Sequence, residues 1–141
     1  MSPGVESRVR ESFGMQTAMQ SIGAVLASVA PGKVEIHMPY NSQFTQQNGY
    51  LHAGVVTMIV DSACGYAALT LAPPDTNVLT VEYKANFMAP ARGDSFVATG
   101  RVLKAGKTLA VCQGEVRALT AGADDIVVVA MQATIMILRQ P

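Results

Sequence analysis

Charged residues are scarce in this sequence of 141 residues. Lysine, arginine, aspartate and glutamate together make up 14% of the chain, whereas an average soluble domain has roughly 25%. Ten basic and ten acidic residues give a formal net charge of zero, so no excess of positive charge would attract DNA or RNA, and we expect no nucleic-acid partner. Half of the residues are apolar, which favours a homo-oligomer that hides apolar surface in an interface.

Cysteine and targeting signals are also nearly absent. The two cysteines, Cys64 and Cys112, lack the close spacing of a metal site, so we expect reduced core thiols in a cytoplasmic protein and no bound metal. The first 15 residues contain charges of both signs and no long apolar run, unlike a secretory signal. Residues 53–72 form one apolar run, but it contains Asp61 and lacks aromatic or basic anchors. We therefore interpret it as a buried helix and expect no membrane partner.

The pattern of apolar residues predicts one long helix and about six strands in a single domain. Residues 6–20 have the loose helical spacing of an amphipathic helix, within an N-terminal extension over 1–20. Residues 53–71 are apolar on nearly all sides and too numerous for one strand, which indicates a buried helix ended by Pro73. Alternating apolar and polar residues predict strands within 24–39 (two arms around Pro31-Gly32), 77–90, 94–106, 107–119 and 126–138.

These elements predict an α+β fold in which a curved antiparallel sheet wraps the long helix. A sheet has two faces, and one helix covers only one of them. We therefore expect the outer face of the sheet, or one of its edges, to pair with another copy of the chain.

The start of the long helix is a candidate binding site for an anion or oxyanion. A helix that begins after His52 leaves the backbone N–H groups of Ala53, Gly54 and Val55 without intrahelical acceptors. The helix dipole adds about half a positive charge there, which suits a developing oxyanion. An ordinary helix start capped by side chains or water would have the same pattern, and spacing alone does not decide between the two.

Asp61 is the only charged residue in the apolar run over 53–72. Such a carboxylate is either held by a salt bridge or hydrogen bonds, or acts as a catalytic base or nucleophile. It lies eight residues after Ala53, which is ~12 Å along a helix. One acyl group cannot contact both places in one chain. A shared site would therefore need two copies whose helices pack antiparallel across a twofold axis.

The residues around Asp61 resemble a known family. The stretch GYLHAGVVTMIVDSACGYAA, followed by TVEYKANFMAPARGDSFVATGRVLKAGKTLAVCQGEV, is similar to the hotdog-fold acyl-CoA thioesterases of the phenylacetate-degradation (PaaI-like) type. The family pattern is roughly Asn-x-x-Gly-x-x-His-Gly-Gly with an Asp nine residues after the His, and the resemblance covers about residues 35–138. It implies a hotdog domain over residues 1–141 that hydrolyses an acyl- or aryl-CoA thioester to free acid and coenzyme A.

The resemblance also implies roles for individual residues. Asp61 matches the catalytic carboxylate, which attacks the thioester carbonyl or activates water. Thr80, nineteen residues later, approximates the Ser or Thr that holds the water or the carboxylate. His52 matches the histidine that shapes the entrance to the helix.

Three further positions match the oxyanion side of the family site. Ala53 replaces the first Gly of the family pair and keeps the backbone N–H that polarises the thioester oxygen, whereas Gly54 matches the second Gly. Gln46 stands where Asn is common and is one methylene longer. Both departures could tune the choice of substrate.

Substrate contacts are expected from two further groups of residues. Asn48, Val55 and Met58 would line the site, and the acyl part should be apolar. Basic residues would contact the phosphates of coenzyme A, with Lys84, Arg92, Lys104 and Lys107 as candidates. The resemblance implies no separate cofactor. It implies a homodimer with active sites at the subunit interface, commonly paired into a homotetramer.

Two other functions stay open for this fold. A hotdog hydratase or dehydratase acting on 3-hydroxyacyl thioesters would need a His–acid pair, but His52 and Asp61 are more than two helical turns apart. A non-catalytic acyl-CoA sensor would want a regulatory or DNA-binding segment, and no basic helix-turn-helix pattern is visible.

Overall fold

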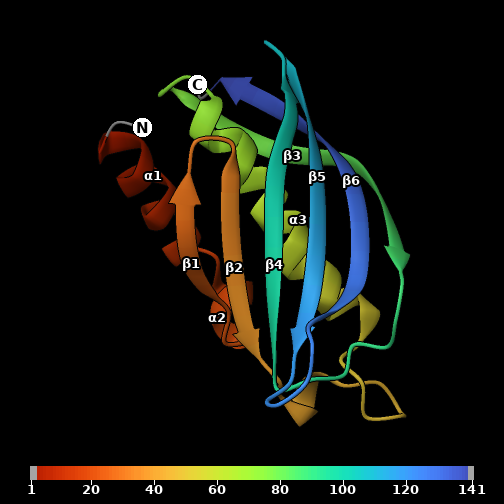
Figure 1. The fold of residues 1–141 in the computed structure, drawn as a ribbon. Helices are drawn as coiled ribbons and strands as arrows, with labels where there is room; N and C mark the ends of the chain where they lie inside the picture. Colours follow the sequence, from red (N-terminus) through yellow and green to blue (C-terminus); the bar gives the residue numbers. More distant parts are fainter. Residues whose placement is uncertain (1–2, 140–141) are drawn as a thin grey trace.

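A long helix wrapped by a curved antiparallel sheet forms the body of the molecule (Figure 1). The computed structural model describes residues 3–139. The strands pair throughout in antiparallel fashion, in the order β1-β2-β4-β5-β6-β3, which confirms the predicted α+β hotdog arrangement. The elements are α1 (Pro3–Gly14), α2 (Thr17–Ser21), β1 (Val25–Ala30), β2 (Lys33–Pro39), the 3-10 helix η1 (Ser42–Phe44), α3 (Ala53–Leu71), β3 (Thr76–Phe87), β4 (Ser95–Ala105), β5 (Leu109–Leu119) and β6 (Ile126–Arg139).

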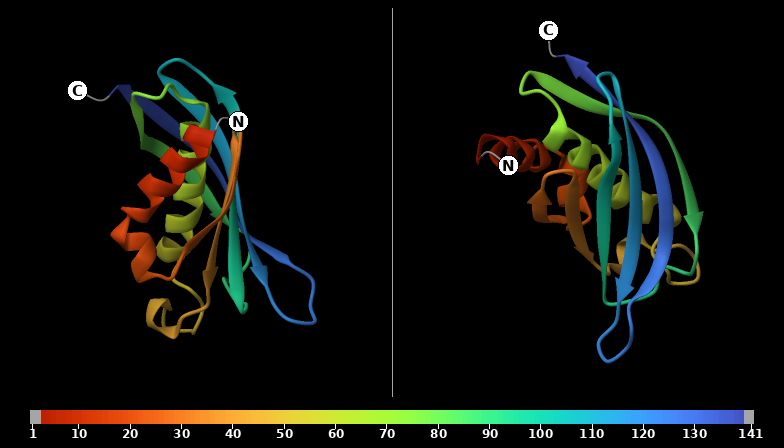
Figure 2. Two further views of the ribbon diagram at one scale, coloured as in Figure 1. Left: turned by 90° about the vertical axis from the view of Figure 1, so that its left-hand side faces the viewer. Right: turned by 45° about the horizontal axis from the view of Figure 1, so that its top comes forward.

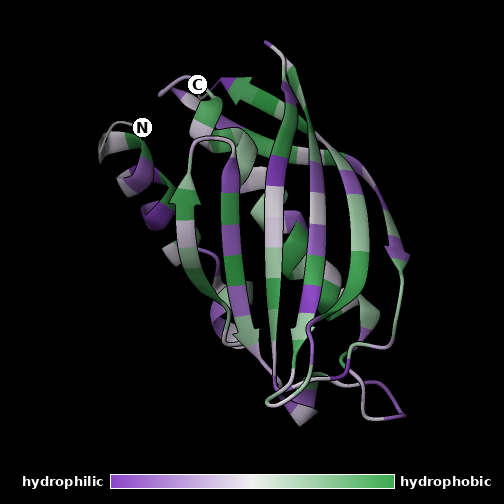
Figure 3. Ribbon diagram, viewed as in Figure 1, coloured by the Kyte–Doolittle hydropathy of each residue, from purple (hydrophilic) through white to green (hydrophobic). Residues whose placement is uncertain are grey.

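The central strands have one buried and one more accessible face, as their alternating sequences predict (Figure 3). In β2, Val34, Ile36 and Met38 are buried against α3, and the residues between them are partly exposed. Glycine at position 32, with φ of +71°, makes the tight turn between β1 and β2, a conformation that side chains disfavour. The predicted turn at Pro31-Gly32 is therefore confirmed.

The helix α3 lies unusually close to the sheet where two glycines face it. Gly100 of β4 and Gly114 of β5 are direct cross-strand partners. A Cβ atom at Gly100 would overlap the backbone of Ala63 and Cys64, and a Cβ atom at Gly114 would overlap the side chains of Val60 and Cys64. Because neither glycine has a side chain, α3 packs directly against the sheet backbone at this point, and this contact sets the distance between the helix and the sheet.

The N-terminal segment differs from the single helix predicted over 6–20. Two helices are present, and Gln16 between them has an extended backbone with φ of −80° and ψ of 95°. Gly14 ends α1, in keeping with the poor helix propensity of glycine. Figure 2 shows α1 beside α3 on the same side of the sheet. The break turns the side chain of Gln16 towards Tyr66 of α3, to whose hydroxyl its Nε2 donates at 2.7 Å.

The helix α3 is buried on most sides, as its apolar sequence predicts, and one stripe along it is only half-buried. Its length and composition would suit a membrane span, yet 61% of its most apolar 18-residue stretch is buried within the fold. A half-buried stripe runs along it at positions 55, 58, 61, 62 and 65. At its C-terminal end the Arg8 guanidinium donates to the carbonyls of Leu69, Ala72 and Pro73 at 2.8–3.2 Å, which satisfies acceptors that a helix end leaves open.

Replacing Gly100 by alanine should destabilise the fold by about 1–3 kcal/mol or more, because the added methyl group overlaps helix backbone that cannot move independently. Gly14→Ala is the matched control, since nothing lies within 4 Å of a Cβ at that position. Urea unfolding would measure both free energies. Equal stability of the two variants would contradict the close seating of α3.

Candidate active site

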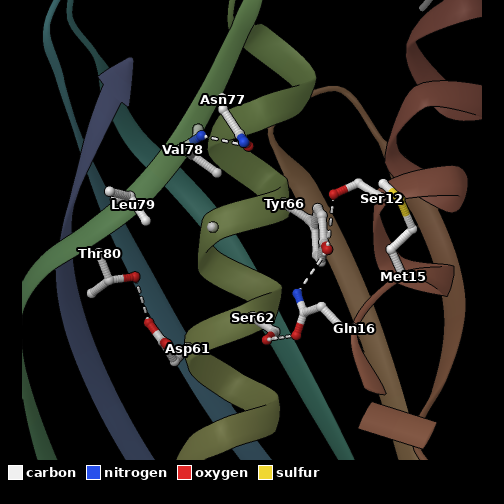
Figure 4. Close-up of a pocket in the computed structure, with 11 residues that line it drawn as sticks. Ser12, Met15, Gln16, Asp61, Ser62, Tyr66, Asn77, Val78, Leu79 and Thr80 are labelled. Carbon is white, nitrogen blue, oxygen red and sulfur yellow. Dashed lines mark hydrogen bonds between the residues drawn. The ribbon is translucent and has the colours of Figure 1, made fainter. Parts of the chain in front are cut away.

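Asp61 and Thr80 meet in the structure although nineteen residues separate them (Figure 4). The Thr80 Oγ1 donates a hydrogen bond to the Asp61 Oδ1 at 2.7 Å. Asp61 lies on the half-buried stripe of α3, and Thr80 lies on β3, at the edge of the sheet beside the helix. This contact holds the carboxylate in one orientation and leaves its second oxygen open.

A β-bulge in β3 directly after Thr80 controls which side chains face α3. The register with β6 shifts between Thr80 and Glu82. Thr80 lies opposite Ile135 and Tyr83 opposite Ala133, both buried residues, whereas Glu82 pairs with Thr134 and accepts its hydroxyl at 3.1 Å. The bulge therefore lets Thr80 and Tyr83 share the inner face. Bulges often re-aim a side chain next to a functional site in this way.

The surroundings of Asp61 differ from those of a structural ion pair. Within residues 3–139, no Lys, Arg or His side chain forms a salt bridge with it. Thr80 is its side-chain hydrogen-bond partner. A half-buried carboxylate with a single hydroxyl partner keeps lone pairs free for a water molecule or a substrate.

A cavity of about 550 Å³ opens beside Asp61 and Thr80, within the size range of small-molecule sites. Its other walls come from the N-terminal helices, from α3 and from the start of β3. The side chains of Ser12, Gln16, Ser62, Tyr66 and Asn77, which line it, are absent from the sequence-based set of candidates. Only their contacts across the fold reveal them, because their spacing in the chain follows no motif.

The start of α3 offers one open backbone donor where three were predicted. The Gly54 N–H donates to the Nδ1 of His52 at 2.9 Å, and the Val55 N–H donates to the His52 carbonyl at 2.9 Å. His52 is thus the helix cap. Within the described chain, the Ala53 N–H is left without an acceptor and is exposed. The oxyanion donor that this helix end provides is therefore Ala53, while Gly54 and Val55 are already paired.

Gln46 lies next to Ala53 in a second, smaller cavity of about 160 Å³. Its Oε1 accepts the backbone N–H of Asn48 at 2.5 Å, and its backbone N–H donates to Tyr50. Asn48 therefore holds Gln46 in place through its backbone. The Nε2 group of Gln46 has no acceptor within residues 3–139 and is free to donate to a ligand.

The candidate residues thus form two separate groups in one chain. Gln46 and Ala53 line the small cavity, and Asp61 and Thr80 line the large one. Eight residues of helix separate Ala53 from Asp61, which is ~12 Å. The side chains of Val55 and Met58 line neither of these cavities and lie half-buried on the α3 stripe that includes Asp61.

The four basic candidates are all exposed and do not come together in one chain. Arg92 follows Ala91, which lines the small cavity near the start of α3. Lys107 and Lys104 belong to the hairpin that joins β4 and β5, and Lys107 lines a cavity with Leu71 at the far end of α3. Lys84 lies opposite the exposed Gln132, on the sheet face turned away from α3.

Both cysteines are free, buried thiols. Burial raises the pKa of Cys112 to about 11 and raises the pKa of Cys64 further, with the nearby Cys112 and Asp61 adding to the effect of burial. A thiol is nucleophilic only as the thiolate. Neither cysteine is therefore a candidate nucleophile at neutral pH, and within residues 3–139 no cluster of three or more His, Cys, Asp or Glu could hold a metal ion.

Comparison with known proteins places the chain in a family. The sequence model that describes the thioesterase superfamily matches residues 48–123 of this chain. These residues include the start of α3, Asp61 and Thr80. The chain belongs to the thioesterase superfamily. A solved thioesterase family protein from Silicibacter pomeroyi is 43% identical, with a TM-score of 0.94 over 96% of this chain and 99% of that one.

Other relatives either match a shorter part of this chain or have a lower sequence identity to it. Human acyl-coenzyme A thioesterase 13 is 38% identical over 86 residues, which are 60% of this chain and 61% of that protein. A relative from Saccharolobus solfataricus is 36% identical over 84 residues, so the match spans 59% of that protein's length. The PaaI protein of E. coli shares the fold at a TM-score of 0.82, with 17% identity over 98% of this chain and 94% of that one.

The thiols should be unreactive in the native protein and should make it less stable at alkaline pH. Because unfolded thiols ionise near pH ~8.5, the unfolded chain binds fewer protons than the folded one from there up to the raised pKa values. The free energy of unfolding should therefore fall as pH rises from ~8.5 to 11.

Denaturant unfolding at a series of pH values, together with titration by a thiol-reactive dye, checks this expectation. The variant Cys112→Ala should show a less steep alkaline slope, because only Cys64 then contributes to it. Rapid labelling of both thiols in the native state would contradict their burial.

Proposed function

We propose that this chain is an acyl-CoA thioesterase that hydrolyses an acyl- or aryl-CoA thioester to the free acid and coenzyme A. The observation that supports this most is the Asp61 carboxylate, held by Thr80 at a cavity and without a basic partner in the described chain. Membership of the thioesterase superfamily and the similarity to human acyl-coenzyme A thioesterase 13 support the reaction and the substrate class.

In the proposed reaction, Asp61 acts at the thioester carbonyl carbon. As a general base it takes a proton from water while the water oxygen bonds to that carbon; as a nucleophile it forms the bond itself and water cleaves the resulting anhydride. In both routes the carbon–sulfur bond breaks, the sulfur leaves with the bond electrons, and the thiolate of coenzyme A is protonated. Water supplies the added atoms, so the reaction needs no separate cofactor.

The carbonyl oxygen gains negative charge in this reaction and needs donors placed in advance. The open Ala53 N–H at the positive end of α3 and the free Nε2 of Gln46 are such donors. They are too far from Asp61 in one chain to act on the same carbonyl group. We therefore propose a homodimer in which Asp61 and Thr80 of one copy face Ala53 and Gln46 of the other.

The strand β3 supports this arrangement. It is an edge strand that exposes 49–59% of each of four large apolar side chains, Leu79, Val81, Tyr83 and Phe87. An exposed apolar edge strand is a template for pairing with another chain. The inner sheet face is occupied by α3, and the outer face bears charged side chains such as Glu35, Arg101 and Glu115, so of the two expected contact regions the edge suits a dimer better.

The positions of the two cavities fit an antiparallel pairing of β3 with its copy. The large cavity includes Asn77 to Thr80 at the start of β3, and the small one includes Phe87 at its end. Antiparallel pairing about a twofold axis in the middle of β3 would bring the start of one strand beside the end of the other. Each large cavity would then adjoin the small cavity of the second copy.

Several finer features belong to this proposal. Arg92 is the best placed of the four basic candidates to contact coenzyme A, because its neighbour Ala91 lines the small cavity. We propose a cytoplasmic location, where two free thiols would remain reduced. A homotetramer, which the resemblance implies, stays a prediction.

Replacing Asp61 by asparagine should lower kcat by at least about 100-fold, the usual contribution of a general base or nucleophile. Thiol release from short-chain, medium-chain and aryl-CoA thioesters would measure this effect. Asp75→Asn is the control, because Asp75 is exposed, pairs with Arg139 and does not line the cavity. Full activity in Asp61→Asn would overturn the mechanism. If the wild type binds acyl-CoA tightly but hydrolyses none of these thioesters, the non-catalytic acyl-CoA sensor would be favoured.

A further inference from the structure

The large cavity extends away from Asp61 over a glycine of α3. Gly65 lies one helical turn after Asp61 and lines the cavity. Its φ is not positive, and a Cβ atom there would meet only the Val78 Cγ2 at 3.9 Å. Neither backbone conformation nor packing therefore requires glycine, which is unfavourable in the middle of a helix. What the missing side chain provides is space beside the carboxylate.

The far wall of this cavity is polar and is built by a hydrogen-bonded chain of four side chains (Figure 4). The Gln16 Nε2 donates to the Tyr66 hydroxyl at 2.7 Å, and the Ser62 hydroxyl donates to the Gln16 Oε1 at 3.4 Å. The hydroxyls of Ser12 and Tyr66 are 3.2 Å apart. Tyr66 is itself only 5% exposed and packs edge-on against Phe13, with ring centroids 6.0 Å apart, so the wall stands on a fixed base.

This wall has hydrogen-bonding capacity that the protein does not use. The amide of Gln16 has two N–H groups, and only one has an acceptor within residues 3–139. Because Tyr66 accepts from Gln16, its own hydrogen can go to Ser12, which leaves the Ser12 hydrogen free for a ligand. Both open donors belong to side chains that line the cavity.

We propose that this cavity is the acyl subsite and that Gln16, supported by Tyr66, selects acyl groups with a hydroxyl or carbonyl oxygen at their far end. This inference rests on the proposed thioesterase function. The oxygen of such a group would accept from the open N–H of Gln16, whereas a purely apolar chain would cover this donor and leave it unpaired. Sites built to hydrogen-bond a substrate discriminate strongly against analogues that lack the polar group.

The length of the subsite guides the choice of probes. Tyr66 lies five residues after Asp61, or ~7.5 Å along the helix, and a six-carbon acyl chain spans a comparable length. We would therefore compare hexanoyl-CoA with 6-hydroxyhexanoyl-CoA, which differ only in the terminal hydroxyl. The variant Gln16→Leu removes the donors at similar size, and Gln20→Leu is the matched control, because Gln20 is exposed on α2 and its Nε2 bonds to Gly14.

The wild type and Gln20→Leu should prefer the hydroxylated substrate by about tenfold in kcat/KM, the effect of one hydrogen bond. In Gln16→Leu this preference should disappear, because the variant has no amide to donate to the terminal hydroxyl. An unchanged preference in Gln16→Leu would overturn the selection by Gln16 while leaving the thioesterase function intact.

A binding measurement tests the acyl subsite independently of the proposed thioesterase function. Calorimetric titration with the non-hydrolysable thioether analogues of both substrates reports the subsite without chemistry. If the wild type hydrolyses neither thioester but still binds the hydroxylated analogue more tightly, and Gln16→Leu does not, the subsite stands and the thioesterase function fails. Equal affinity of both analogues for the wild type would overturn the subsite.

Gly65→Ala tests the space beside Asp61 separately. The methyl group should raise Tm by about 2–4 °C, because alanine is the better helix former. It should also lower kcat/KM for hexanoyl-CoA severalfold more than for acetyl-CoA, since only the longer chain reaches over position 65. Equal losses on both substrates would contradict an acyl group lying over Gly65.

Discussion

The close contact between α3 and the sheet at the Gly100–Gly114 pair is the constraint on which the other features depend. Two strands without side chains at the contact point let the helix backbone at Ala63 approach the sheet. With the helix at that height, a residue two positions earlier, Asp61, lies within hydrogen-bonding distance of Thr80 on the edge strand. The bulge after Thr80 completes the geometry, because it allows the hydroxyl to face the helix while Glu82 faces outward.

A single rigid helix also explains why one chain holds only half of the proposed site. The open Ala53 N–H is at the beginning of α3, and Asp61 is two turns further along. No loop movement shortens that separation, because both groups belong to the same helix. The apolar edge of β3 and the half-buried stripe of α3 lie next to Asp61, where a second copy can dock. The N-terminal helices cover the opposite flank and supply Gln16, so the proposed acyl subsite is made within one chain and the oxyanion donors come from the other.

The sequence predicted the long helix, the strands and the pairing of Asp61 with Thr80 because these depend on local periodicity or on a recognisable motif. It could not predict that His52 pairs the Gly54 and Val55 N–H groups, since helix starts with and without such caps look alike in sequence.

The polar wall of the large cavity could not be predicted from the sequence either. Gln16 and Tyr66 are fifty residues apart and meet only because the chain breaks after Gly14, a break that the loosely helical pattern over 6–20 did not indicate. Arg8 was missed for the same reason, as its three carbonyl partners lie more than sixty residues away.

The central claim is that each active site combines residues of two chains. Chains with Asp61→Asn and chains with Gln46→Ala can be coexpressed with different tags, and the mixed dimer can be purified through both tags. Each parent homodimer should be deficient, because one lacks the carboxylate and the other an oxyanion donor worth about 100-fold or more. The mixed dimer has one site with both defects and one intact site, so it should recover about half of the wild-type kcat. A mixed dimer no more active than the average of its parents would show that each site lies within one chain and would contradict the account.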